Sequence, residues 1–418
     1  MNILVAGMKQ NTLYHMRAVL TSATGQVFDQ DHTFQTGAIP PSLIPALQVT
    51  IPPGQNPTPG IQLVSGFGEA FAVNPTGDIV WFYNYQVAGG PWLVKLLPNG
   101  NMLMILLYPG TDSSGIREVD LAGNIVRQLD LLDLSNKLTS AGYNIQLSSI
   151  DHDVLLLPNR HLLLITADYR VFTDLPGYPG QTTVIGNAII DVDQNNNPVW
   201  VWDAFDHLDV NRHPINFPDW THANSLFYVP DDGTLLLSLR HQHWVLKIDY
   251  RNGKGPGDIL WKLGYQGDFT LQSDSPADWF YAQHDANIVS PNLTGDFQLA
   301  IFDNGDYRVL DDSGDVCNPS GQPACYSTAA IFDVNENTKT ASRLWSDQTP
   351  YSSWGGSTQE LSNSNVFFNE TAPADLDGSR IMEVTQQPNP TTVWKLEVQT
   401  GNSYRAEHLP SLYPGVQW

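Results

Sequence analysis

The polar and apolar positions of residues 61–418 repeat as short strands joined by tight turns. Each repeat has a strand, a turn of the P-[ND]-G kind, a run of aliphatic residues, a third strand and a closing strand. The turn and aliphatic run are clearest at 96–106, 156–166, 228–240 and 290–302. The closing strands, most with Trp between apolar neighbours, lie near residues 81, 125, 200, 260, 344 and 394. Strand units that recur every ~40–50 residues are typical of a β-propeller.

The chain is therefore predicted to be all-β, with a six-bladed β-propeller over residues 61–418. Closing strands are up to 84 residues apart, which predicts long loops of the kind that commonly build binding sites. Residues 1–40 alternate as strands do and predict the C-terminal part of a small fibronectin-like β-sandwich. Residues 41–60 predict a proline-rich linker. The clearest helical periodicity falls near Leu129–Leu138.

Composition supports a large folded core and excludes some partners. The 418 residues are 41% hydrophobic, and 20 Lys+Arg against 43 Asp+Glu give a net charge of −23. Nucleic acid and anionic membrane surfaces need a basic footprint, so neither is expected as a partner. No apolar run approaches the ~18 residues of a membrane span. The first twelve residues do not have the pattern of a signal peptide.

The two cysteines bear on the compartment. Cys317 and Cys325 lie in a Pro/Gly-rich loop, and either form a short disulfide hairpin or remain free thiols. Two cysteines cannot by themselves complete a zinc site. A disulfide would indicate a periplasmic or extracellular protein.

Three histidines occupy equivalent places in consecutive blades. His152, His222 and His284 each precede the proline of a turn by 6 to 8 residues, and they are 70 and 62 residues apart. In a propeller, the strand at this place is the innermost one, which runs along the central channel. The three imidazoles are therefore predicted to converge on one cavity. The remaining histidines His161, His207, His213 and His408 show no such register and are interpreted as structural or exposed.

Arg240 ends an aliphatic strand eighteen residues after His222, so one hairpin would bring it back beside that histidine. The alternative is an arginine that extends along a blade edge. His241 and His243 follow directly, and the RHQH segment is interpreted as a solvated strand end rather than a metal site.

Aromatic residues cluster just before the histidines. Trp220 precedes His222, while Trp279, Phe280 and Tyr281 precede His284, and Tyr351 and Trp354 occupy the matching place in the next blade. If these segments form the mouth of the channel, they would wall the cavity with rings and suit a flat aromatic ligand with an anionic group. The alternative is that the rings pack between blades.

Taken in order, the segments HAN, the PDDG turn, LLLSLR, DILWKLG, QHDAN and IFDNG resemble the PAPS-independent bacterial arylsulfate sulfotransferases. The resemblance covers about residues 61–418 and is most specific within 220–305. It implies a six-bladed propeller with a small N-terminal β-sandwich. It also implies transfer of a sulfuryl group from a phenolic sulfate ester to another phenol, by a ping-pong route through a sulfohistidine.

Carried over by motif, the resemblance makes His284 the nucleophile, His152 and His222 the supporting histidines, and Arg240 the anion-binding arginine. Asn224 and Asn304, with Trp220, Trp279 and Tyr281, are expected to bind substrate. No cofactor and no metal are expected. The expected partners are small aromatic sulfate esters and phenols, and homo-oligomerisation is left open.

The chemistry also fits the residues taken alone. Sulfuryl transfer resembles phosphoryl transfer in its loose transition state, which needs positioned cationic or N–H donors such as Arg240 and His222. A neutral imidazole of His284 can attack sulfur, while His152 or His222 exchanges the phenolic proton. These groups predict a positive pocket inside a negatively charged exterior.

Two other classes of function remain open. One is a non-catalytic extracellular propeller that binds a small anion or a protein through its loops. The other is a metal-dependent hydrolase or lyase that uses the three histidines as ligands.

Overall fold

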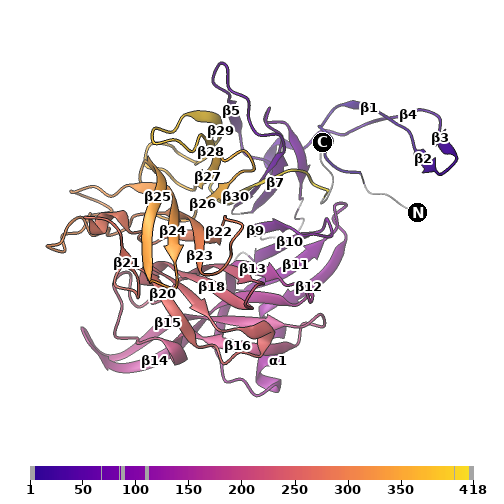
Figure 1. The fold of residues 1–418 in the computed structure, drawn as a ribbon. Helices are drawn as coiled ribbons and strands as arrows, with labels where there is room; N and C mark the ends of the chain where they lie inside the picture. Colours follow the sequence, from indigo (N-terminus) through magenta and orange to yellow (C-terminus); the bar gives the residue numbers. More distant parts are fainter. Residues whose placement is uncertain are drawn as a thin grey trace.

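The protein, described here by a computed structural model, is a six-bladed β-propeller (Figure 1). The structure describes residues 5–66, 68–83, 85, 90–108, 113–399 and 401–413. Each blade is an antiparallel sheet with a core of four strands, and two blades carry a fifth strand at the outer edge. The predicted all-β, six-bladed architecture is confirmed.

The blades follow one another along the chain, apart from one strand of blade 1 and one of blade 6. Blade 1 has the order β30 (Ser403–Leu409), β6 (Ile61–Gly66), β7 (Glu69–Val73) and β8 (Ile79–Phe82). Blade 2 has β9 (Gly90–Leu96), β10 (Met102–Tyr108), β11 (Ser113–Val119) and β12 (Ile125–Asp130). Blade 3 has β13 (Leu147–Leu156), β14 (Leu162–Leu175), β15 (Tyr178–Val192) and β16 (Pro198–Asp203).

The other three blades complete the ring. Blade 4 has β17 (Ala223–Val229), β18 (Thr234–Leu239), β19 (Trp244–Ile248) and β20 (Ile259–Gly264). Blade 5 has β22 (His284–Ile288), β23 (Asp296–Asp303), β24 (Ser327–Asn335) and β25 (Thr340–Thr349), with the short β21 (Thr270–Leu271) outside. Blade 6 has β26 (Ser357–Glu360), β27 (Val366–Glu370), β28 (Ser379–Val384) and β29 (Thr392–Val398), with β5 (Leu47–Thr50) outside.

The C-terminal strand closes the ring. β30 pairs antiparallel with β6, so that Leu409 lies opposite Ile61 and Ser403 opposite Gly66. The last strand of the chain therefore forms the innermost strand of the first blade. It lies along the central channel with β9, β13, β17, β22 and β26.

The closing tryptophans hold adjacent blades together. Trp200, Trp261 and Trp394 lie on the fourth strand of their blades and are buried. The indole N–H of Trp200 donates to the carbonyl of Gly255 in the next blade at 3.0 Å. That of Trp394 donates across the ring closure to the carbonyl of Pro75 at 2.7 Å. The repeated Trp thus provides apolar packing and a hydrogen bond between blades at each of these positions.

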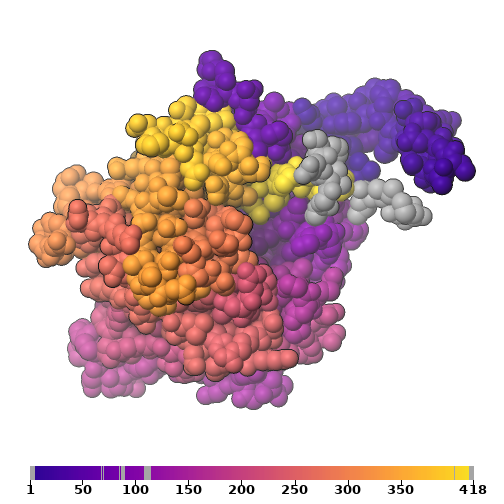
Figure 2. Space-filling model, viewed as in Figure 1, coloured from indigo at the N-terminus to yellow at the C-terminus, as the bar shows by residue number. Residues whose placement is uncertain are grey.

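The N-terminal segment lies apart from the ring. Strands β1 (Leu13–Met16) and β4 (His32–Gln35) pair with each other, as do β2 (Val19–Ser22) and β3 (Gly25–Phe28). Figure 2 shows this indigo ribbon projecting from the body of the molecule. Within residues 41–60, expected as a linker, β5 pairs with β29 and so belongs to blade 6.

Helices are few and short. The expected helix is α1 (Leu131–Ser140), which buries Leu134 and Leu138. The others are α2 (Ala204–His207) and the 3-10 turns η1 (Pro41–Leu43), η2 (Arg240–Gln242), η3 (Arg251–Gly253) and η4 (Pro276–Asp278). Among the described residues, no helix has the length and apolar character required to cross a membrane.

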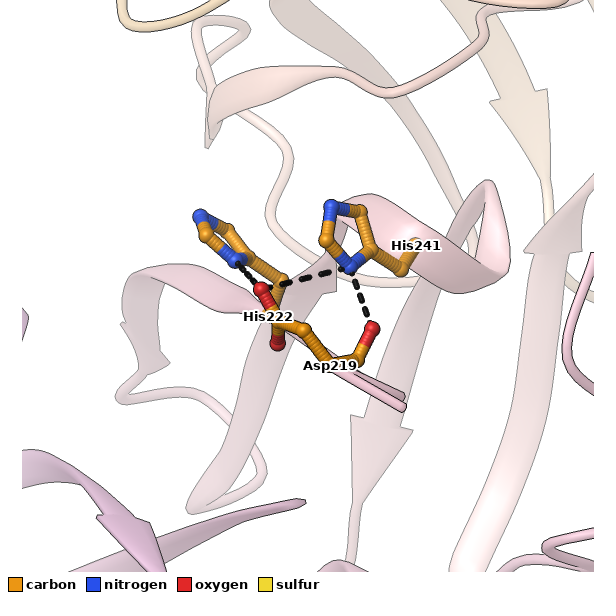
Figure 3. A group of neighbouring side chains, drawn as sticks. All are labelled: Asp219, His222 and His241. Atoms are coloured by element: carbon orange, nitrogen blue, oxygen red, sulfur yellow. Dashed lines mark hydrogen bonds and ion pairs between the residues drawn. The ribbon is translucent and has the colours of Figure 1, made fainter. Parts of the chain in front are cut away.

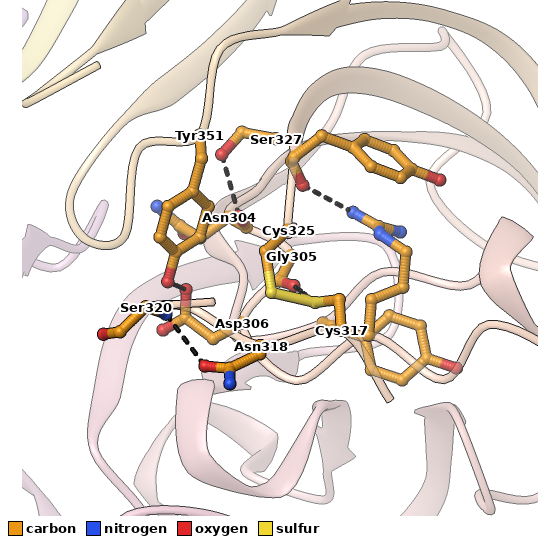
Figure 4. Close-up of a disulfide and its surroundings, with 12 residues drawn as sticks. Asn304, Gly305, Asp306, Cys317, Asn318, Ser320, Cys325, Ser327 and Tyr351 are labelled. Carbon is orange, nitrogen blue, oxygen red and sulfur yellow. Dashed lines mark hydrogen bonds between the residues drawn. A yellow bond between two sulfur atoms is a disulfide. The ribbon is translucent and has the colours of Figure 1, made fainter. Parts of the chain in front are cut away.

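The two cysteines form the predicted disulfide (Figure 4). Cys317 and Cys325 are bridged with their Cα atoms 5.1 Å apart, in the loop between β23 and β24. The segment Asn304–Asp306 at the start of this loop lies beside the bridge in Figure 4. The disulfide therefore closes a loop that, as shown below, reaches the candidate site.

Candidate functional site

The three predicted histidines converge. The ring centroids of His152 and His222 are 4.7 Å apart. Those of His152 and His284 each lie 6.0 Å from the ring of Tyr404, which stands between them on the innermost strand of blade 1. The predicted meeting of equivalent positions from blades 3, 4 and 5 is confirmed.

An irregularity in each inner strand accompanies this convergence. Pairing shifts register after Ile150 in β13, after Ala223 in β17 and after His284 in β22. His152 and His222 have positive φ angles of 59° and 48°, and Asp285 has 54°. A bulge of this kind bends a strand and re-aims its side chains, and such bulges are over-represented next to active sites.

His284 is held as a neutral ring with a defined tautomer. Its Nδ1 lies 2.7 Å from Oδ1 of Asn304. The amide nitrogen of Asn304 donates to the carbonyls of Ser352 and Gly355, so its oxygen is the acceptor and Nδ1 of His284 carries the hydrogen. Burial, followed by the charge of Arg240, places the pKa of His284 well below its ordinary value. Nε2 therefore keeps its lone pair.

The environment of that lone pair is unusual. The backbone N–H of Gly355 donates to Nε2 of His284 over 3.3 Å, a long hydrogen bond. The ring is only 2% exposed. Asn304, which is expected to bind substrate, holds His284 with its side-chain oxygen and binds two backbone carbonyls with its amide nitrogen.

Asp219 organises the second histidine (Figure 3). Its carboxylate Oδ2 is 2.7 Å from Nδ1 of His222, which orients that ring. Burial, with the nearby His152 and Arg240, lowers the pKa of His222 well below its ordinary value. The ring of His222 is thus neutral, and its Nε2 remains open to a ligand.

The expectation of a solvated RHQH segment is wrong for His241 and His243. His241 is 2% exposed and donates from Nδ1 to the carbonyl of Asp219 at 2.6 Å. Its Nε2 accepts from Arg240 and, at 3.1 Å, from Asn216. His243 is equally buried and accepts from the N–H of Ala282. Burial lowers the pKa of His241 to about 2 and that of His243 to about 3.

Arg240 lies beside His222, as the hairpin count predicts. Its backbone N–H donates to the carbonyl of His222 at 3.1 Å, and its side chain is 7% exposed rather than extended along a blade edge. The guanidinium contacts the carboxylate of Asp306, the ring of His241 and the carbonyl of Ser353. Asp306 and His241 therefore hold the guanidinium of Arg240 in place, and this guanidinium is the positive charge that would bind an anion.

His152 completes the cluster from blade 3. Its Nδ1 lies 3.1 Å from Oδ1 of Asp151, and the edge of Trp92 stands 5.8 Å from its ring. Asn224, from the HAN segment, is fully buried and donates to the carbonyl of Gln283 at 2.6 Å. Its side-chain oxygen has no hydrogen-bond partner among the described residues.

One group of side chains in the described part of the chain has a spacing compatible with a metal ion. The ligand atoms of Asp219, His222 and His241 lie within 4.8 Å of one another. However, both ring nitrogens of His241 are already hydrogen-bonded, one to a carbonyl and one to donors including Arg240. A metal would have to displace the bonds that position Arg240. The arrangement fits an anion site better than a cation site.

The aromatic wall differs from the prediction. Trp220, Trp279 and Tyr281 are buried in apolar cores between blades, where Trp220 stacks on Phe205 at 5.1 Å. Packing between blades, the alternative left open above, is what the structure shows. The rings that reach this cluster are Trp92 and Tyr404, which sequence reasoning missed because neither lies near His152, His222 or His284 in the chain.

The central channel below the histidines is not purely positive. A cavity of about 280 Å³ is bordered by Lys95, Asp153, Asp285, Arg405 and Glu407. Arg405 lies 3.4 Å from Asp153 and 3.3 Å from Asp285, and Lys95 also pairs with Asp153. The expected positive pocket is thus corrected, because carboxylates follow directly after His152 and His284. Positive charge at the histidines comes from Arg240.

Comparison with solved structures found β-proteins of low similarity. A putative 6-phosphogluconolactonase from Bacteroides fragilis NCTC 9343 matches with a TM-score of 0.45 and 11% identity, covering 85% of this chain and 100% of that chain. The periplasmic gluconolactonase of Pseudomonas aeruginosa matches with a TM-score of 0.40 and 11% identity, covering 84% and 99%. At these values the likeness carries no argument about function.

Sequence comparison is more informative. A search of curated proteins found no match. The family model described as Arylsulfotransferase (ASST) matches residues 55–406, which include nearly all of the propeller and all of the site residues described above. The chain therefore belongs to the arylsulfotransferase family.

Proposed function

We propose that the protein transfers a sulfuryl group from a phenolic sulfate ester to an acceptor phenol through a covalent intermediate on His284, without PAPS. Family membership supports arylsulfotransferase activity in general. The observation that carries the finer proposal is the state of His284. Its Nδ1–H is bound by Asn304, and its Nε2 is an unprotonated, buried nucleophile.

In the first half-reaction, the lone pair of Nε2 attacks sulfur, and the bond between sulfur and the phenolic oxygen breaks. The leaving phenolate takes the electron pair. Charge on the sulfuryl oxygens is stabilised by Arg240, which Asp306 and His241 hold in place. The N–H of Gly355, once it loses Nε2 as its acceptor, becomes a further donor at the same place.

In the second half-reaction, the oxygen of an acceptor phenol attacks sulfur and the bond to Nε2 breaks, returning its electron pair to His284. The phenolic proton goes to a neutral imidazole. His222 is suited to this role, because the carboxylate of Asp219 orients its ring through Nδ1 and stabilises the positive charge that forms when Nε2 takes the proton. His222 then releases that proton to solvent or to a departing phenolate. Splitting one displacement into two makes each step easier.

The proposal also includes the cellular location of the enzyme and its substrates. The Cys317–Cys325 disulfide supports a periplasmic or extracellular location. The substrates are then small aromatic sulfate esters and phenols. Asn224 supports substrate binding, since its buried side-chain oxygen lacks a partner among the described residues.

Intact-mass spectrometry after mixing with an aryl sulfate alone tests the mechanism. We expect the wild type to gain one sulfuryl group, and His284→Ala to gain none. His161→Asn is the matched control, because His161 is hydrogen-bonded to Asp191 away from the cluster and its variant should be sulfated normally. A sulfuryl group still present on His284→Ala would overturn His284 as nucleophile.

A further inference from the structure

Several buried polar atoms at the channel lack hydrogen-bond partners. Among the described residues these include Oδ1 of Asn224, Nε of Arg240 and the hydroxyl of Tyr404. A buried polar group without a partner destabilises the folded protein, and most such groups are satisfied. The unsatisfied hydroxyl of Tyr404, whose ring lies beside two of the three histidines, therefore indicates that a polar ligand completes it.

Tyr404 belongs to this place by geometry. Its ring lies 6.0 Å from the rings of both His152 and His284 and 5.0 Å from that of Trp92. Only 1% of its surface is exposed.

The backbone of Tyr404 is tied to the loop that reaches the nucleophile. Its carbonyl accepts from the N–H of Gly356 at 2.9 Å. The adjacent N–H of Gly355 is the group that contacts Nε2 of His284. Tyr404 and His284 are therefore held by the same two-residue segment.

The raised pKa of the Tyr404 hydroxyl makes it a hydrogen-bond donor. Burial raises the pKa of Tyr404 above its ordinary value, so the group remains an O–H donor rather than becoming a base. A neutral donor is useful to an anionic ligand and cannot exchange the phenolic proton. His152 and His284 flank the ring, and His284 is the residue that attacks sulfur in the proposed reaction.

We infer that the hydroxyl of Tyr404 donates a hydrogen bond to a non-bridging oxygen of the sulfuryl group, making Tyr404 a substrate-binding residue that the sequence motifs do not indicate. The inference rests on the proposed function. It adds a hydrogen-bond donor from β30, the innermost strand of blade 1, to the cation supplied by Arg240.

The variant Tyr404→Phe tests this inference because it removes one oxygen atom and keeps the ring. Two measurements are needed: the affinity for inorganic sulfate by isothermal titration calorimetry, and the rate of sulfation by an aryl sulfate in a single turnover. Loss of a hydrogen bond to a charged group weakens binding roughly 10- to 100-fold. We expect the Kd for sulfate to rise and the sulfation rate to fall by factors in that range, with no loss of thermal stability.

Tyr250→Phe is the matched control. Tyr250 is also buried, but its hydroxyl donates to Asp191 at 2.6 Å on blades 3 and 4. This variant should lose thermal stability while keeping the affinity for sulfate and the sulfation rate.

The outcomes separate the two proposals. Unchanged sulfate affinity and unchanged sulfation in Tyr404→Phe would overturn the role of Tyr404. A wild type that binds sulfate but is never sulfated would overturn the proposed function, and the sulfate affinities would still decide about Tyr404. A wild type that does neither would overturn both.

Discussion

The carboxylate of Asp306 holds the guanidinium of Arg240, although the two residues belong to different blades. Arg240 follows the second strand of blade 4, and Asp306 lies in the connection between β23 and β24 of blade 5, ahead of the segment that the disulfide closes. The hydroxyl of Tyr351 donates to the other oxygen of Asp306 at 2.7 Å, so the carboxylate is itself fixed. The cation of the site is thus positioned across a blade boundary.

Replacement of Asp306 by Asn should release Arg240 without removing it. We expect kcat/KM for sulfuryl transfer to fall about 10- to 100-fold, because loss of one charge-assisted hydrogen bond corresponds to ~1.5–3 kcal/mol. Steady-state kinetics with an aryl sulfate and a phenol measure this. Asp311→Asn is the control, since Asp311 binds only its own turn at Ser313 and Gly314. Equal losses in both variants would contradict the positioning role of Asp306.

The rate of enzyme sulfation should fall only at a lower pH than the ordinary pKa of histidine predicts. Because burial lowers the pKa of His284, its neutral nucleophilic form persists as the pH falls through the ordinary histidine value of about 6.5. We expect single-turnover sulfation of the enzyme to show no inflection near that pH and to decline only under more acidic conditions. Rapid-quench measurements between pH 5 and 8 check this, and a tenfold loss per pH unit below pH 6.5 would contradict it.

Glu407 should make stability depend on pH. Burial raises its pKa to about 7 in the folded protein. The folded state therefore keeps a proton that the unfolded chain releases above about pH 4.3, so this group's contribution to stability declines as the pH rises from there to 7. Glu407→Gln removes the dependence. Its gain in unfolding free energy over wild type should be about 2–3 kcal/mol larger at pH 8 than at pH 5.

Urea denaturation at the two pH values measures that difference. Glu397→Gln is a suitable control, because Glu397 is ion-paired with Lys395 on β29, the fourth strand of blade 6. A constant difference between Glu407→Gln and wild type across this pH range would show that Glu407 is ionised in the folded protein.

The repeat and its register were readable from the sequence because a propeller places equivalent residues at equivalent radii. Spacing along the chain was enough to predict two features, without knowing the paths of the loops. One is the place of the three histidines before their turns, and the other is the place of Arg240 one hairpin after His222. The Cys317–Cys325 pairing followed from short separation in the chain. Each of these predictions depended only on the number of residues between positions within one blade.

The failures have physical causes of a different kind. Trp220 lies two residues before His222 and would share its face in a regular strand, but the positive φ of 48° at His222 breaks that alternation. His241 is buried beside the loop that carries Asn216, and no spacing of residues in the sequence predicts that contact. The roles proposed for Asp306 and Tyr404 likewise depend on contacts between blades.

The pairing of β30 with β6 also fixes when the site can exist. The first blade is completed only by residues 403–409, near the end of the chain. During synthesis the three histidines emerge long before this strand, so the channel has no closed ring to hold them and Tyr404 is not yet present. A chain that stops before residue 403 should therefore be inactive even with His152, His222, His284 and Arg240 intact. The channel is therefore complete only after β30 has docked on β6, and a growing polypeptide lacks the site until residues 403–409 have emerged.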